Sequence, residues 1–256
     1  MTRRMGKAVY MACVYLFLYA PIAVLIVLSF NDNKYLTTWK GFTFRWYNAL
    51  FTHSQLLDAA VHSLTVAALS ATLATVLGTL AATAIHQHRF RGRRLLQSAL
   101  FVVIVSPDIV MGVSLLTLFV ALRIELGFIT LLLSHITFCL PFVAVTVHAR
   151  LKDFDVHILE AAEDLGASEY QAFRHVILPL IRPAVLAGWL LSFTLSLDDV
   201  IISFFVTGPG FEILPLRIYS MVRLGVKPEV NALSALLVTG TVAVVIASQL
   251  LLREKK

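Results

Sequence analysis

Six apolar segments of about 20 residues or more constrain this fold more than any other feature of the sequence. A helix that crosses a bilayer needs about 20 mostly apolar residues, because the hydrocarbon core is about 30 Å thick. Only 14% of the 256 residues are charged, against about 25% in a soluble domain, which excludes a soluble enzyme, a disordered chain and a nucleic-acid-binding protein. We therefore predict an all-α integral membrane protein with six transmembrane helices, over residues 9–30, 63–85, 95–122, 126–148, 184–206 and 231–252.

The basic residues predict the orientation of these helices. Six spans place both termini on one side, and with the termini in the cytoplasm 14 of the 21 Lys and Arg residues are cytoplasmic. This excess agrees with the positive-inside rule. The densest basic run, HRFRGRR at 88–94, is interpreted as a topology anchor, with binding of anionic lipid as the alternative. The prediction is a multi-pass protein of the cytoplasmic membrane with both termini inside.

Two of the predicted loops contain sequence features that a simple connection between spans does not require. Residues 37–51 are crowded with aromatic side chains, which is typical of an interfacial helix at headgroup level. This segment is a candidate for contact with an external partner, and packing over the helix ends is an alternative of at least equal weight. The cytoplasmic loop 149–183 predicts two short helices. The first covers 156–166 and ends at Gly166, and the second begins with a capping box of Ser168 and Gln171 and stops at Pro179.

The string EAAEDLGASEYQAFRHVILP in this loop resembles the EAA signature of the membrane subunits of bacterial ABC importers. The resemblance implies a type I importer transmembrane domain, whose EAA loop couples to a separate ATPase. No ATP-binding motif occurs in the chain, so we expect no catalytic residue and no cofactor here, with ATP and Mg bound by the partner ATPase. The matching positions are Glu160, Ala161, Ala162, Gly166, Val176, Leu178 and Pro179, with valine at 176 where isoleucine is usual.

A narrower resemblance extends over nearly the whole chain. The segments at 106–116, 135–143 and 192–209 are similar to the spermidine/putrescine permeases, and most similar to the second of their two permease subunits. The resemblance implies a heterodimer with a related permease, two cytoplasmic ATPase subunits, a periplasmic polyamine-binding protein and a polyamine substrate. It also implies an N-terminal helix with an interfacial periplasmic segment over 1–58 and an ABC transporter type-1 core over 59–252, with the coupling loop at 149–183.

Three acids lie inside the predicted spans. A carboxylate at the bilayer centre costs about 2.5 to 3.5 kcal/mol, so Asp108, Asp198 and Asp199 should face the bundle interior or a wet cavity. We expect Asp108 and at least one of the other two to line a path for a polycation, with cation–π contacts from Phe193 and Phe204. Adjacent helical residues point about 100° apart, so one acid of the pair is expected to meet the partner permease or cap a helix break. The alternative for all three is a buried acid that stabilises a break.

Other interpretations remain open at this stage. A related importer of another solute, such as an opine, an amino acid or a ferric ion, would keep the EAA loop. An ion-coupled secondary carrier would use the three acids as ion sites, although the chain has no evident inverted repeat. We expect His135 to be a hydrogen-bonded packing residue. Cys13 and Cys139 are expected to be small buried residues, with no disulfide and no metal site.

Overall fold

The computed structural model describes residues 2–34, 38–52, 54–152, 158, 161–162, 164–223 and 228–253. For residues 2–5, 51, 52, 54, 241 and 243–253 only the backbone is described. Within these ranges the chain is helical apart from loops and two isolated β-bridges. It divides into two compact units, which are Met1–Asp58 with Arg217–Lys256, and Ala59–Leu216.

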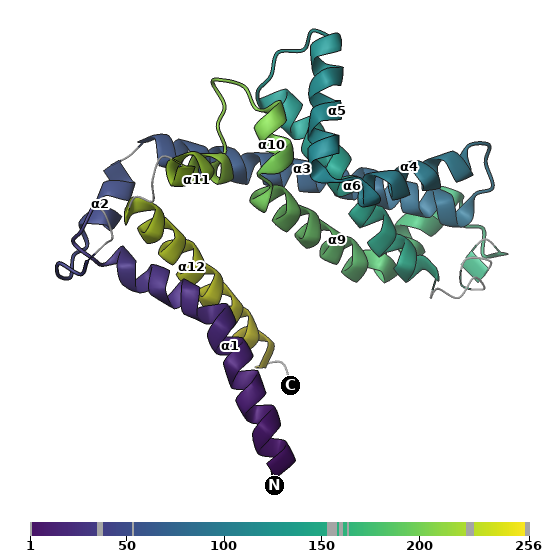
Figure 1. The fold of residues 1–256 in the computed structure, drawn as a ribbon. Coiled ribbons are helices and arrows are strands. Elements are labelled where there is room, and N and C mark those ends of the chain that lie inside the picture. Colours follow the sequence, from purple (N-terminus) through teal and green to yellow (C-terminus); the bar gives the residue numbers. More distant parts are fainter. Residues whose placement is uncertain are drawn as a thin grey trace. The chain divides into compact units, whose positions relative to one another are not determined.

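In the first unit, two long helices lie side by side (Figure 1). Helix α1 covers Thr2–Ser29 and α12 covers Pro228–Arg253. Most described side chains of α1 are exposed apolar groups, including Cys13, which the sequence analysis wrongly expected to be buried. A helix whose apolar side chains face outward all round is typical of a lipid-facing span.

The aromatic segment folds back over the end of α1. It contains α2, which covers Arg45–Thr52. The Phe30 ring stacks on Phe42, with centroids 5.0 Å apart, and on Tyr47 at 5.1 Å. The buried Trp46 donates its indole N–H to the Asn31 carbonyl over 2.8 Å. These contacts support the packing alternative for this loop.

The second unit is built around α6, which covers Phe128–Lys152 and packs along α9, Leu178–Asp198. Helix α3 covers Ser54–Gln87. A Cβ on its Gly78 would lie 2.8 Å from the Val143 Cβ of α6, and one on Gly188 of α9 would lie 3.2 Å from Val143 Cγ1. Lipid-embedded helices associate by close packing of small residues, so these glycines let both helices approach α6 closely.

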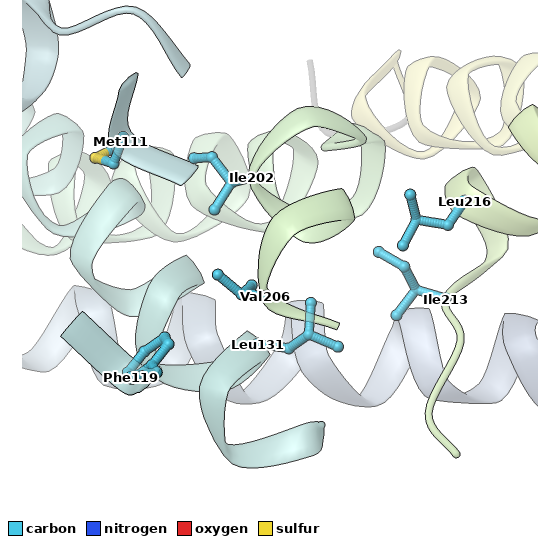
Figure 2. Close-up of a cluster of buried hydrophobic side chains, with 7 residues drawn as sticks. All are labelled: Met111, Phe119, Leu131, Ile202, Val206, Ile213 and Leu216. Atoms are coloured by element: carbon cyan, nitrogen blue, oxygen red, sulfur yellow. The ribbon is translucent and has the colours of Figure 1, made fainter. Parts of the chain in front are cut away.

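Two further helices complete the core of this unit. Helix α5 covers Asp108–Ala121, and α10 covers Ile201–Val206. They pack against each other, and Figure 2 shows the apolar side chains that lie between the elements. The cluster consists of Met111, Phe119, Leu131, Ile202, Val206, Ile213 and Leu216. Ile213 directly precedes α11, Leu214–Arg223, and Leu216 lies in its first turn.

Two of the predicted continuous spans are interrupted. The segment 95–122 forms α4, Arg93–Val105, and then α5, bent by 116° at the break. The residue before a proline avoids the helical region, and Ser106 accordingly is extended, with φ −66° and ψ 133°. The segment 184–206 breaks at Asp199 and Val200, between α9 and α10. Each break places an aspartate at a helix end rather than in mid-helix.

The number of spans is settled only in part. In the described part of the chain, four helices are long and apolar enough to cross a membrane, and the bent pair α4–α5 raises this to five. The 26-residue helix α12 covers the sixth predicted segment. Six spans therefore stay a prediction.

The second helix of the loop 149–183 begins as predicted but does not stop where predicted. Ser168 accepts from the Gln171 backbone N–H while the Gln171 side chain accepts from the Ser168 N–H, which is the expected capping box. Helix α8, Glu169–Ala172, then widens into the π-helical turn η1, Phe173–Ile177, and runs into α9. Pro179 does not end the helix, which runs continuously from Glu169 to Asp198. It lies directly after the π-helical turn, an irregularity of the kind at which helices absorb a proline.

Candidate functional site

The break between α4 and α5 presents an acid, Asp108, whose carboxylate bonds no side chain or backbone group among the described residues. Asp108 is the first residue of α5 and follows Pro107 directly. The Pro107 carbonyl accepts from the Val110 and Met111 N–H groups over 2.9 and 3.1 Å. In the described part of the chain, the half-buried Asp108 carboxylate has no hydrogen bond or ion pair.

The break between α9 and α10 is organised differently, because Asp199 is buried and caps α10. Its Oδ1 accepts from the Ile202 N–H over 3.3 Å, and its Oδ2 accepts from the Ser203 N–H over 2.8 Å. The same Oδ2 accepts from the Ser203 hydroxyl over 2.7 Å. Helix starts leave N–H groups without intrahelical partners, and this carboxylate satisfies two of them. One member of the aspartate pair thus caps a local break, as one of the two sequence-based alternatives stated.

The Asp199 cap continues into a buried polar network that joins four helices. His135 of α6 is fully buried, and its Nε2 lies 2.9 Å from Ser203 Oγ and 3.6 Å from Asp199 Oδ2. Its Nδ1 lies 2.7 Å from Ser196 Oγ of α9. Ser196 Oγ is in turn 3.0 Å from Ser70 Oγ of α3. The prediction that His135 is a hydrogen-bonded packing residue is confirmed, and the structure adds that it bridges both sides of the break.

The other residues predicted for the path do not gather at one point. Asp198 is the last residue of α9 and is exposed. Phe193 is half-buried and stacks on Trp189, with centroids 5.3 Å apart. Phe204 is 55% exposed and packs edge-on against Phe205. Only Asp199 among the predicted path residues belongs to the buried network.

The coupling loop is described in part. Glu160 lies outside the described residues, while Ala161 and Ala162 are helical. Gly166 has φ +84°, a left-handed conformation that glycine adopts without strain. The Ala167 N–H donates to the Ala162 carbonyl over 3.0 Å, which is the bond that closes a Schellman C-cap. Gly166 therefore ends this helix as predicted.

Leu178 and Pro179 occupy the start of α9, in the same helix as the capping box. One feature of this loop was missed by the sequence analysis. Leu165, next to the glycine cap, is 89% exposed. Single exposed apolar side chains are common on protein surfaces, so the leucine before Gly166, although visible in the sequence, carries no signal of a protein contact by itself.

The serines of the buried network were also missed. Ser70, Ser196 and Ser203 come from three helices, and their hydroxyls meet only after the chain folds. The available signal was polar residues recurring within an apolar run, as at 192, 196 and 203. Serine is common at packed helix interfaces in membranes, so this signal alone does not identify a network.

Comparison of the chain with known proteins identifies its family. The family described as "Binding-protein-dependent transport system inner membrane component" matches residues 74–253. The chain is 58% identical over 255 residues to the spermidine/putrescine transport system permease protein PotC of Escherichia coli K12, covering 100% of this chain and 97% of that protein. PotC of Haemophilus influenzae is 53% identical, covering 99% of each chain. The putrescine transport system permease protein PotI of E. coli K12 is 45% identical, covering 94% of this chain and 88% of its own length.

Solved structures share the fold at low sequence identity. A chain of a bacterial ABC transporter that imports the acidic polysaccharide alginate superposes with a TM-score of 0.77 at 16% identity, covering 98% of this chain and 96% of that one. A chain of the MetNI methionine ABC transporter in an inward-facing conformation gives a TM-score of 0.63 at 17% identity, covering 78% and 96%. The chain therefore has the fold of ABC importer permeases and belongs to the family of binding-protein-dependent transport system inner membrane components.

Proposed function

We propose that this chain is the membrane-embedded permease subunit of an ATP-driven importer of polyamines, spermidine and putrescine among them. The observation that carries the proposal is the 58% identity, along the whole chain, to a spermidine/putrescine permease. The relative with a putrescine permease name supports the same substrate class at 45% identity.

The chemistry of the two helix breaks supports a polycationic substrate. Asp108 and Asp198 form no ion pair within the described residues, so their charges are available to an ammonium group. A charge-assisted hydrogen bond contributes about 1.5 to 3 kcal/mol. Phe193 and Phe204 can add cation–π contacts of about 0.5 to 2 kcal/mol each.

Asp199 takes a different part in the proposed path. Its carboxylate already accepts three hydrogen bonds from α10. A carboxylate has about four acceptor positions, so little capacity remains for a substrate. We therefore assign the contact with substrate to Asp108 and Asp198, with Asp199 supporting the break from inside.

The coupling assignment completes the proposal. Six helices with both termini in the cytoplasm place 149–183 on the cytoplasmic side of the core at 59–252. The ATPase contact is assigned to Glu160, Ala161, Ala162, Gly166, Leu178 and Pro179, and the exposed Leu165 supplies an apolar anchor for it. A related permease, two ATPase subunits that bind ATP and Mg, and a periplasmic polyamine-binding protein complete the complex. In this arrangement the chain itself hydrolyses no ATP.

The test is transport by the reconstituted complex. This chain is co-expressed with a related permease, an ABC ATPase and a polyamine-binding protein from the same organism, purified through a tag on this chain and placed in proteoliposomes. We expect uptake of radiolabelled spermidine or putrescine that requires both ATP and the binding protein. The control is a complex whose ATPase carries a substitution in its ATP-binding lysine.

Three other outcomes would contradict the proposal. Uptake of an amino acid, an opine or a ferric ion in place of polyamine would make this chain a permease for another solute. Uptake by this chain alone, driven by an ion gradient and indifferent to ATP, would make it a secondary carrier. No ATP-dependent uptake of polyamine by an intact, ATPase-active complex would also reject it.

A further inference from the structure

The hydrogen-bond directions in the buried network determine which nitrogen of His135 carries a proton. A hydroxyl has a single hydrogen, and the Ser203 hydroxyl donates it to Asp199 Oδ2. Ser203 Oγ must then accept from His135 Nε2–H, across 2.9 Å. In the neutral ring Nδ1 is left as an acceptor, and it receives the Ser196 hydroxyl across 2.7 Å. Ser196 Oγ also lies 3.0 Å from Ser70 Oγ, and the Ser70 hydroxyl has the Ala67 carbonyl as a second acceptor at 3.3 Å.

This chain of bonds crosses the break between α9 and α10. Ser196 lies in the last turn of α9, and Ser203 lies in the first turn of α10. Only Asp199 and Val200 separate the two helices. A fully buried ring that bonds both serines therefore limits how α9 can end relative to α10.

The bridge through His135 constrains the position of Asp198. Asp198 is the last residue of α9, two residues after Ser196 and directly before the capping aspartate. Its side chain is exposed, so its position depends on the backbone of the break. His135 itself is 0% exposed, so a substrate cannot reach it without opening the network.

We propose that His135 is a positioning residue, which holds the Asp198 carboxylate where it meets an ammonium group of the polyamine. The inference rests on the proposed function and adds a role for a residue that does not touch the substrate. Asp199, Ser203 and Ser196 transmit the effect of His135 to the end of α9. If His135 only filled space, its substitution would change the stability of the protein, and its effect on transport would not depend on Asp198.

A double-mutant cycle on the reconstituted complex separates the two roles, since residues that act through one another are not additive. His135→Leu keeps the volume approximately and removes both bonds, and we expect the KM for spermidine uptake to rise tenfold or more. In the Asp198→Asn background the same change should alter the KM less than twofold. If the fold-changes in KM of the two single variants multiply in the double variant, the two residues act independently and the proposal is overturned.

Two conservative variants keep the test valid if His135→Leu fails to reach the membrane. The His135→Gln side chain offers one donor and one acceptor and is long enough to reach both serines, so we expect a KM within threefold of wild type. His135→Asn is shorter by one methylene and should raise the KM at least fivefold. Equal KM values for the two would overturn the positioning role. Thr130→Val is the matched control, because Thr130 lies on the same helix and bonds the Val206 carbonyl at the far end of α10.

A second measurement reads the position of residue 198 without any substrate. Asp198→Cys is placed in a background in which Cys13 and Cys139 are alanine, and the membranes are treated with a cationic methanethiosulfonate. We expect His135→Leu to change the modification rate at least fivefold and His135→Gln to change it less than twofold. An unchanged rate in both would overturn the role of His135. Failure of polyamine uptake by the wild-type complex would instead reject the proposed function, while these rates would still decide whether His135 positions residue 198.

Discussion

The two broken helices of the second unit use the same residue type in opposite ways. At the α4–α5 break, Asp108 follows a proline, and in the part of the chain that the structure describes its carboxylate has no protein partner. At the α9–α10 break, Asp199 accepts three hydrogen bonds and lies 3.6 Å from a fully buried histidine. The first break is produced by backbone sterics and the second by side-chain hydrogen bonds.

The two breaks show that an acid inside an apolar run can have either a structural or a transport role. A buried charge is tolerated when protein groups satisfy it, and it then contributes to the structure of the break. An acid left without partners in a membrane protein points instead to a substrate or ion path. The same substitution should therefore affect stability at one break and transport at the other.

The largest expected effect is on stability at the α9–α10 break. Asp199→Leu leaves two backbone N–H groups of α10 and the Ser203 hydroxyl without their acceptor. Unpaired buried donors of this kind cost about 3 kcal/mol. We expect a clear loss of thermal stability in detergent, measured by size-exclusion chromatography after heating. Asp108→Leu is the comparison and should change stability by less than about 0.5 kcal/mol, as substitutions without broken contacts do; equal losses at both positions would remove the distinction.

The next largest effect is expected on transport, from substitutions of Asp108 and Asp198. Asp108→Asn and Asp198→Asn each keep the size of the side chain and remove the charge. We expect the KM for spermidine uptake to rise about tenfold, equivalent to about 1.4 kcal/mol, at unchanged amounts of complex in the membrane. Glu125→Gln is the control, since Glu125 is exposed in the short loop between α5 and α6. Unaltered uptake in both aspartate variants would show that neither meets the substrate.

The smallest expected effect is on stability, when a hydroxyl is removed from the buried network. Removal of a hydroxyl from an exposed helix face is the comparison. Ser203→Ala removes the bonds to Asp199 and His135, and we expect a loss of about 1 kcal/mol, measured by unfolding in mixed detergent micelles. Ser114→Ala removes only a bond to the Val110 carbonyl one turn back on an exposed face, so its stability should match wild type. A larger loss for Ser114→Ala than for Ser203→Ala would argue against the network.

Local features of the fold were predictable from the sequence because they depend on neighbours in the chain. The Ser168–Gln171 capping box and the left-handed Gly166 lie within a few residues of the groups they bond. The apolar runs likewise gave the positions of the long helices. Pro179 was mispredicted as a helix end, because the helix continues past it from Glu169 to Asp198 by way of the π-helical turn directly before it, which no local sequence pattern indicated.

The candidate site was predictable only as a list of acids. That Asp199 caps α10 was one of two alternatives, and choosing between them required the position of Ser203. The His135 network needed contacts across 61 and 68 residues of sequence, which no local pattern encodes. Both helix breaks interrupt otherwise apolar runs, so span length alone did not reveal them.

A structure of the assembled complex with bound spermidine would test the division between the two breaks most directly. The account predicts an ammonium nitrogen about 3 Å from the Asp108 or Asp198 carboxylate. It also predicts that Asp199 remains bonded to Ser203, with His135 still bridging Ser196 and Ser203. An ammonium group seated on Asp199, with the His135 bridge open and both Asp108 and Asp198 away from the ligand, would contradict it.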